Sequence, residues 1–182
     1  NYIGGQFKVL PGAAFPQTKN EIDNFIPVAR ISDLLLNPGK KFDFDGKTYE
    51  YPNTKIVYWA GGNPFHHHQD LNRLISAWEK PDTIISNEWC WNTLAKRSDI
   101  VLPCTTPLER SDIMMTPRDP YVVSMSKLVE PYGKAKNDFE IFAGISKKMN
   151  LEEKFTEGRN QEEWQKWIYA QTYERAAVAN ID

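Results

Sequence analysis

The chain of 182 residues is long enough to bury one full-sized hydrophobic core. Its 22 basic and 24 acidic side chains give a formal charge of −2, which excludes a broad basic surface, so no nucleic-acid partner is expected. An apolar content of 41% with six tryptophans indicates a packed globule rather than disorder. No apolar run reaches the ~18 residues that a membrane-spanning helix needs, so no membrane span is expected.

Residues 1–54 are predicted to form loops, a short helix and a β-hairpin packed on the main domain. The sequence opens without Met on a stretch rich in Gly and Pro, and we interpret it as part of a longer polypeptide. Apolar residues within 20–39 indicate a short helix that stops at the Asn-Pro-Gly sequence 37–39. Aromatic and polar residues then alternate on both sides of the Asp-Gly pair 45–46, which is typical of a tight hairpin turn.

Residues 55–150 are predicted to form a cofactor-binding α/β domain. Lys55 to Ala60 is a short apolar run closed by two glycines, as expected of a parallel strand buried on both faces. Further strands are expected at 83–86 and 100–102, with helices between them after Asp70 and at 92–96. The order β-α-β-α-β indicates an α/β fold: a doubly wound, mainly parallel open sheet with helices on both faces, in a Rossmann-like three-layer arrangement.

The rest of the chain is expected to add a polar loop, one strand and two helices. The loop spans 103–120 and the strand 121–125, and a helix at 138–149 turns Phe139, Phe142 and Ile145 inward. Residues 151–182 are predicted to be a C-terminal helical extension. Its helix opens with Asn160 and Glu163 in the spacing of a capping box.

Three loops follow the carboxyl ends of the predicted strands, at 61–70, 87–92 and 103–112, and ligands of open parallel sheets bind at such ends. In the first loop, the glycine pair 61–62 lets main chain approach a ligand, which suits a diphosphate or a flat heterocycle. A simple turn is the alternative. The motif is neither GxGxxG nor GxxxxGK[ST], so neither nicotinamide nor P-loop chemistry is indicated.

The first loop also carries three consecutive histidines, 66–68, close to Asp70. Imidazole and carboxylate are ordinary zinc ligands, but adjacent side chains diverge, so we do not expect them to share one metal ion. A hydrogen bond from one imidazole to a cofactor and simple packing of the loop are the two remaining interpretations.

Glu88 in the second loop follows a strand directly, where a carboxylate accepts hydrogen bonds from a sugar or a purine. Guanine presents N1–H and a 2-amino group side by side, and one carboxylate can accept both. A solvated surface Glu is the alternative. Trp89 and Trp91 are expected to pack against the sheet, and Cys90 and Cys104 to be buried free thiols.

In the third loop, Thr105 and Thr106 offer hydroxyl donors and Arg110 offers a planar fork that fits a phosphate. An ion pair between Glu109 and Arg110 is the alternative. No Ser-His-Asp spacing or facing carboxylate pair is present, so no catalytic residue and no metal ligand are assigned.

Five separated stretches cover most of residues 26–164 and carry a family resemblance: IPVARISDLLLNPG, YWAGGNPFHHHQDLNRL, SDIVLPCTTPLERSDI, NDFEIF and FTEGRNQEEW. Together they resemble the bacterial molybdopterin oxidoreductases of the dimethyl sulfoxide, trimethylamine N-oxide and biotin sulfoxide reductase group. The segment GGNPFHHHQDLNR is specific to this branch. Two residues depart from it: many relatives have Asp in place of Glu88 and Ala in place of Cys104.

The resemblance implies a molybdenum oxidoreductase that transfers an oxygen atom from an S-oxide or N-oxide to molybdenum held between two molybdopterin guanine dinucleotides (bis-MGD). An α/β domain of this kind binds one dinucleotide, and the resemblance places these residues along it: Gly62, Asn63, His67, Asn87, Glu88, Thr105, Arg110 and, more weakly, Asp138. The metal ligand in this branch is a serine of a preceding domain. The chain alone is therefore predicted to be inactive.

The implied partners are the remaining domains of the same polypeptide, a cytochrome or other electron donor, and a small-molecule oxide. Family members occur in the periplasm and in the cytoplasm, and the periplasm is the expectation here. An alternative function is a non-catalytic nucleotide-binding domain that scaffolds a redox complex. Metal binding at residues 66–68 is a third hypothesis.

Overall fold

A computed structural model describes residues 15–16, 26–115 and 122–178, with side chains as far as Glu174. The chain divides between Cys104 and Thr105 into two compact units. We name them the N-terminal unit (described residues 26–104) and the C-terminal unit (described residues 105–115 and 122–178). The division falls inside the range 55–150 that the sequence suggested as one domain.

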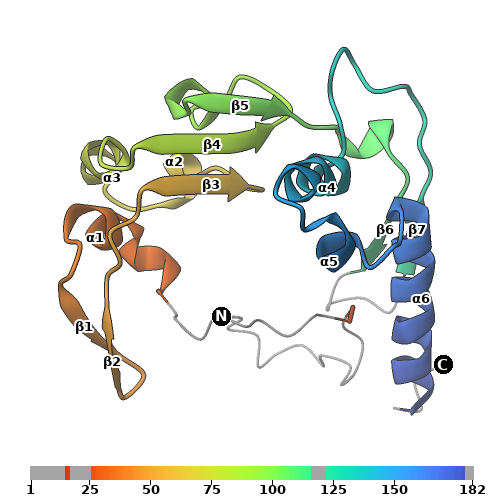
Figure 1. Cartoon of the computed structure of the whole chain (residues 1–182), viewed down its shortest axis with the longest axis horizontal. Helices are drawn as coiled ribbons and strands as arrows, with labels where there is room; N and C mark the ends of the chain where they lie inside the picture. The colour runs from red at the N-terminus through yellow and green to blue at the C-terminus, as the bar shows by residue number, and fades with distance from the viewer. Residues whose placement is uncertain (1–14, 17–25, 116–121, 179–182) are drawn as a thin grey trace. The chain divides into compact units, whose positions relative to one another are not determined.

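The N-terminal unit contains a hairpin, a parallel sheet and short helices (Figure 1). Its elements in chain order are a 3₁₀ helix (Val28–Arg30), α1 (Ile31–Leu36), β1 (Lys41–Phe44), β2 (Lys47–Glu50), β3 (Ile56–Ala60), α2 (Pro64–His67), α3 (Leu71–Trp78), β4 (Thr83–Glu88), a second 3₁₀ helix (Ala95–Arg97) and β5 (Ile100–Pro103).

The sheet has the order β3-β4-β5, and all three strands are parallel (Figure 1). β4 is central, and its last four side chains include three that are buried. Its register pairs Ala60 with Asn87 and Glu88 with Pro103, so the three strands end at the same edge. The predicted α/β class with an open parallel sheet is confirmed, in a three-stranded form.

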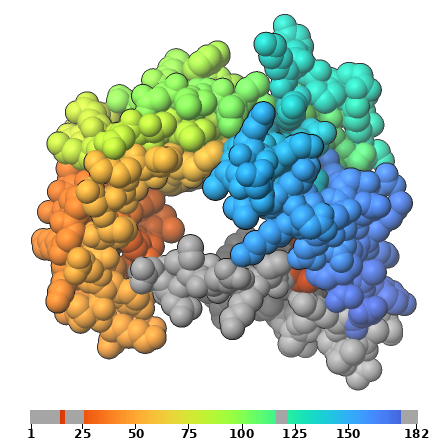
Figure 2. Space-filling view, in the orientation of Figure 1, coloured from red at the N-terminus to blue at the C-terminus, as the bar shows by residue number. Residues whose placement is uncertain are grey.

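The core of the N-terminal unit lies where α1 and α3 pack beside this sheet. Its buried members are Leu35, Phe65, Leu74, Ala77, Trp78, Ile84 and Leu94. α3 begins where predicted, because Asp70 Oδ1 accepts a hydrogen bond from the Arg73 main-chain N–H at 3.2 Å. Arg73 also pairs with Asp33 of α1, which ties the two helices together. In Figure 2 the side chains of residues 26–104 (orange to green) form one continuous body.

The β1–β2 hairpin is confirmed as predicted. The turn residues Asp45 and Gly46 have φ of 50° and 73°, as a tight antiparallel turn requires. The helix expected within 20–39 is α1 with its preceding 3₁₀ turn, and it ends at Leu36. The part of that prediction before residue 26 lies outside the described residues.

Three sequence-based boundaries are corrected by the structure. β4 runs two residues further than the expected 83–86, so Asn87 and Glu88 belong to the strand and not to the loop. The first loop contains α2, and the expected polar loop at 103–120 contains a 3₁₀ turn and a strand. In each case the local structure is determined by pairing with a neighbouring strand or by an end cap. The hydrophobic pattern of the sequence contains neither kind of information.

The C-terminal unit consists of a small antiparallel hairpin and three helices (Figure 1). Its elements in chain order are a 3₁₀ helix (Pro107–Glu109), β6 (Asp112–Met115), β7 (Val122–Met125), α4 (Asp138–Lys148), α5 (Glu152–Thr156) and α6 (Gln161–Val178). The predicted capping box is present: Glu163 N–H donates to Asn160 Oδ1 at 3.0 Å, and Asn160 N–H donates to Glu163 Oε2 at 2.8 Å.

α4 and α5 pack through aromatic rings. Phe139 and Phe142 contact Phe155 with ring centroids 5.7 Å and 6.4 Å apart, so the predicted apolar side of α4 is confirmed at these two positions. The most buried apolar residue of α4 is Ile141, which the sequence pattern did not select. Within the described ranges, no helix combines the length and apolar character needed to cross a membrane.

Candidate functional site

The turn after β3 presents main chain at the carboxyl edge of the sheet. Gly61 and Gly62 have φ of 83° and 73°. Residues with a side chain adopt this left-handed backbone conformation only with strain. Trp59 Nε1 donates to the Gly61 carbonyl at 2.8 Å and holds the turn in place. A Cβ on either glycine would meet nothing within 4 Å, so open space lies beside both residues.

Asn63 closes this turn by capping α2. Its Oδ1 accepts from the Phe65 main-chain N–H at 3.0 Å, and Pro64 occupies the first helical position, where it has no N–H to lose. Pro64 and Phe65 are buried, which fixes the direction in which α2 leaves the sheet. The Asn-Pro pair was the signal in the sequence that identifies this short helix.

The three histidines do not converge on a point. His66 and His67 are exposed and stack edge to face at 5.3 Å, whereas His68 is half-buried with its ring edge toward Trp59 at 6.5 Å. Burial lowers the pKa of His68, and the neighbouring His67 lowers it further. Within the described residues, no group of three His, Cys, Asp or Glu side chains is placed to hold a metal ion.

Asn87 and Glu88 are buried at the end of β4, with 4% and 7% of their surfaces exposed. The Tyr58 hydroxyl of β3 donates to Asn87 Oδ1 at 2.8 Å, which fixes that amide to the neighbouring strand. Glu88 Oε2 accepts from Asn92 Nδ2 at 2.8 Å. Glu88 Oε1 is also buried and has no hydrogen-bond partner among the described residues. The alternative of a solvated surface Glu is therefore wrong.

Parallel register brings these two parts of the candidate site to one edge. Ala60 pairs with Asn87, so the Gly61–Gly62 turn and Glu88 leave adjacent strands at the same level. Glu88 is further fixed by its own carbonyl, which accepts from the Cys104 N–H at 3.2 Å. The edge combines accessible main chain with a carboxylate oxygen that has no donor in the described part of the chain, which suits a ligand rich in N–H groups.

The tryptophans beyond Glu88 are exposed, and the expectation that they pack against the sheet is wrong. Trp89 and Trp91 expose 67% and 71% of their surfaces, and Cys90 between them is exposed as well. The period-two pattern fails here because β4 ends at Glu88 and the next residues form a turn closed by the Asn92 N–H and the Cys90 carbonyl. Cys104 is half-buried.

Thr105 and Arg110 come together within the C-terminal unit. Thr105 is 5% exposed, and its buried Oγ1 has no hydrogen-bond partner in the described part of the chain. Arg110 Nη1 donates to the Thr105 carbonyl at 2.7 Å, and its Nε pairs with Asp112 at 3.1 Å. Both residues line a hollow of about 460 Å³, whose rim includes Lys127.

The alternative of a Glu109–Arg110 ion pair does not hold, because Glu109 has other partners. Its carboxylate accepts from the main-chain N–H groups of Thr106 and Tyr132, each at 2.8 Å, and from the Thr106 hydroxyl at 2.9 Å. These donors hold the pKa of Glu109 below its ordinary value, the Thr106 N–H contributing most. Glu109 therefore shapes the loop, and the guanidinium of Arg110 is oriented by Asp112 instead.

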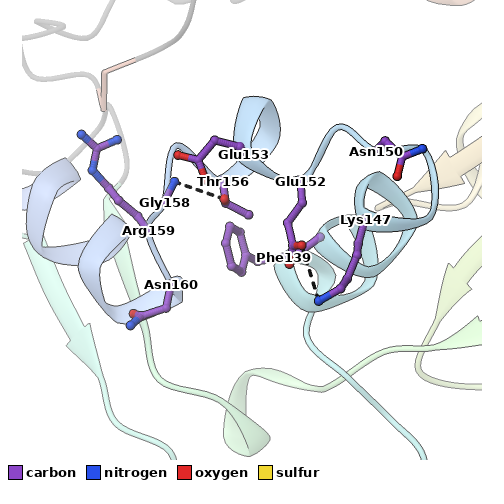
Figure 3. A pocket seen from close by; sticks show the side chains of 10 residues that line it. Phe139, Lys147, Asn150, Glu152, Glu153, Thr156, Gly158, Arg159 and Asn160 are labelled. Atoms are coloured by element: carbon purple, nitrogen blue, oxygen red, sulfur yellow. Dashed lines mark hydrogen bonds and ion pairs between the residues drawn. The ribbon is translucent and has the colours of Figure 1, made fainter.

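Two further features of the C-terminal unit bear on the site. Asp138 is the exposed first residue of α4 and does not line the hollow of Thr105 and Arg110. A larger hollow of about 900 Å³ lies among α4, α5 and the start of α6 (Figure 3). Its cations are already paired, Lys147 with Glu152 at 3.5 Å and Arg159 with Glu157 at 2.6 Å, and it contains none of the predicted site residues.

Comparison of the chain with known proteins identifies the family to which it belongs. The family model described as molybdopterin oxidoreductase matches residues 4–148. The chain belongs to the molybdopterin oxidoreductase family. The resemblance predicted from the five sequence stretches is confirmed, and membership in this family implies a molybdenum–pterin cofactor.

Curated relatives in this family carry the names of S-oxide and N-oxide reductases. The chain is 43% identical over 174 residues to biotin sulfoxide reductase of Cereibacter sphaeroides, covering 96% of this chain and 23% of that protein. It is 46% identical over 158 residues to trimethylamine-N-oxide reductase of Haemophilus influenzae, covering 85% and 19%. The chain therefore spans about a fifth of the length of these relatives.

A solved structure supports the fold. Acetylene hydratase from Pelobacter acetylenicus superposes with a TM-score of 0.59 at 20% identity, over 68% of this chain and 17% of that one. At this identity the likeness shows the fold alone.

Sequence reasoning missed three side chains that shape this family member's site. Tyr58 and Trp59 were placed in the strand as apolar residues, yet each donates a hydrogen bond at the carboxyl edge. Asn92 was placed at the start of a helix without a role toward Glu88. The signal available for Tyr58 and Trp59 was a polar atom on an otherwise apolar strand, since such atoms find partners when buried.

Proposed function

We propose that the chain is a molybdopterin guanine dinucleotide-binding domain of a molybdenum-dependent S-oxide or N-oxide reductase. The observation that carries the proposal is the pairing of the open Gly61–Gly62 turn with the buried carboxylate of Glu88 on adjacent parallel strands. The names of the relatives at 43%, 41% and 46% identity support the reductase class, with biotin sulfoxide, dimethyl sulfoxide and trimethylamine N-oxide as substrate types.

The residues at the sheet edge fit the guanosine end of the dinucleotide. Glu88 Oε1 has no hydrogen-bond donor among the residues that the structure describes, and guanine supplies two neighbouring N–H groups. Adenine presents a ring nitrogen acceptor at the same place, which a carboxylate repels. Asn87, whose amide is held by Tyr58, is proposed for a further polar contact with the nucleoside.

The Gly61–Gly62 turn fits the diphosphate and pterin part. Without Cβ atoms, its main chain allows close approach of a flat or highly charged group, and Asn63 fixes where the turn ends. His67, exposed on α2 beyond this turn, is proposed as a hydrogen-bond donor to the same ligand.

In the C-terminal unit, the hollow around Thr105 fits an anionic or hydroxyl-rich group. The Oγ1 of Thr105 lacks a partner among the described residues, and Arg110 is held in place by Asp112. A hydroxyl and an oriented guanidinium are suitable donors to phosphate oxygens. The contact of Asp138 with the dinucleotide stays a prediction.

The molybdenum of the bound cofactor supplies the oxygen-atom transfer chemistry in such enzymes. Binding and orienting the nucleotide are the tasks proposed for this chain, with the remaining domains, an electron donor and the small-molecule oxide as partners of the whole protein. Its location in the periplasm stays a prediction.

Calorimetric titration of the 182-residue chain with GDP and with ADP tests the nucleotide assignment. We expect GDP to bind more tightly, because only guanine satisfies Glu88. Equal affinities, or no binding of either nucleotide, would contradict the proposal and favour a scaffolding domain without a cofactor.

We also propose that the chain alone does not reduce an oxide, since it spans about a fifth of the relatives that carry this activity. An assay with trimethylamine N-oxide and a chemically reduced viologen dye should show no turnover above buffer. Sustained turnover by the purified chain would overturn this expectation.

A further inference from the structure

Asn92 is held rigidly between the turn after β4 and the 3₁₀ helix Ala95–Arg97. Its side-chain Oδ1 accepts from the Ala95 main-chain N–H at 2.9 Å, and its carbonyl accepts from the Lys96 N–H at 3.1 Å. Its own N–H donates to the Cys90 carbonyl at 2.9 Å. With the hydrogen bond from Nδ2 to Glu88, all four polar groups of Asn92 are engaged: Oδ1, Nδ2, the carbonyl and the main-chain N–H.

These bonds determine which end of the amide faces Glu88. The Ala95 N–H requires an acceptor, so it takes Oδ1, and the Nδ2 group must point toward the carboxylate, which only accepts hydrogen bonds. The Nδ2 to Oε2 distance of 2.8 Å is that of a good hydrogen bond to a charged group. The Glu88 side chain therefore has one orientation imposed by Asn92.

That orientation decides what the carboxylate offers to a ligand. A carboxylate has about four lone-pair sites, and Asn92 uses one of them, on Oε2. Oε1 stays buried without a partner among the described residues. We propose that Asn92 is a positioning residue for nucleobase selection, which holds the carboxylate of Glu88 with Oε1 directed to the N–H edge of a guanine. This inference rests on the proposed binding of a guanine nucleotide.

The residue type supports a role beyond closing the 3₁₀ turn. Ser, Thr and Asp all accept from a main-chain N–H three residues ahead, as Asn92 does from Ala95. Among these four residue types, only Asn adds a donor that can reach Glu88. The need for an acceptor and a donor on one short side chain explains an amide at this position.

An Asn92→Ser variant of the full chain separates the two tasks, because the serine hydroxyl still accepts from Ala95 but is too short to reach Glu88. Calorimetry with GDP and ADP should show GDP affinity falling roughly 3- to 10-fold, with ADP affinity changed less than about 2-fold. Thr93→Ala, an exposed neighbour, serves as the matched control and should leave both affinities unchanged. Asn92→Asp, which also retains an acceptor, should act in the same direction as Asn92→Ser.

A double-mutant comparison distinguishes failure of this inference from failure of the proposed function. In a Glu88→Ala background, Asn92→Ser should cause no further loss of GDP preference, because the group that it positions is gone. Absence of any GDP preference in the unmodified chain would overturn both proposals. A preference that Glu88→Ala abolishes but Asn92→Ser and Asn92→Asp retain would overturn the role of Asn92 alone.

Discussion

Leu74→Ala is expected to lower the unfolding free energy of the N-terminal unit by about 2 to 5 kcal/mol. Leu74 is fully buried on α3, within the cluster that includes Trp78, Ile84 and Leu94. Truncation removes apolar contacts and leaves a cavity that the aromatic neighbour Trp78 cannot easily fill. Since whole domains are typically stable by about 5 to 15 kcal/mol, the loss is a large fraction of the total.

Leu71→Ala on the same helix provides the matched control, because Leu71 is 41% exposed and its loss should change stability by about 0.5 kcal/mol or less. Native-state hydrogen exchange, read at the amides of β4, localises the effect to the N-terminal unit in a chain that has two units. Equal effects of the two substitutions would show that the core does not lie under this side of α3.

The elements predicted correctly are those that are specified by residues close together in the sequence. Alternating aromatics around Asp45 and Gly46 specify a hairpin by themselves, because the turn needs two residues that tolerate positive φ. The cap at Asp70 and the apolar spacing of Leu74 and Trp78 likewise define α3 within one helix length. Hydrophobic periodicity does not tell which apolar positions are buried most deeply, as the exposure of Leu71 shows.

The end of β4 could not be predicted, because its information is tertiary. Asn87 and Glu88 have low intrinsic strand propensity, and the sequence alone suggested that the strand stops at Ser86. They stay in the strand because β3 and β5 pair with them at Ala60, Leu102 and Pro103. This extension buries the carboxylate of Glu88 and so changes its chemistry.

The candidate site was predicted as a set of residues but not as a geometry. Carboxyl-end loops and polar residue types were sufficient to select Gly62, Glu88 and Thr105. The orientation of Glu88 by Asn92 depends on side-chain conformations that no spacing rule describes, and so does the lack of a partner for Thr105 Oγ1 among the described residues. The exposure of Trp89 has the same cause, since it depends on where the strand ends.

Glu88→Ala is expected to weaken GDP binding by about 1 to 3 kcal/mol, or roughly 5- to 150-fold, with little change for ADP. The carboxylate is the acceptor proposed for both N–H groups of guanine, and its removal leaves those donors without partners in a buried setting. The change removes one hydrogen bond within the chain, from Asn92 Nδ2 to Glu88 Oε2, so we expect a modest loss of stability and a variant that still folds. Calorimetry measures the affinities, and circular dichroism checks that the variant is folded.

Glu79→Ala is the matched control, since Glu79 is an exposed glutamate of the same unit just after α3. It removes the same charge from the N-terminal unit, so a general electrostatic effect on nucleotide binding would appear in both variants. Loss of GDP affinity in both would assign the effect to charge. If neither variant loses GDP affinity while the unmodified chain still prefers GDP, guanine is bound by other residues. The buried carboxylate of Glu88 would then contact another group of the ligand.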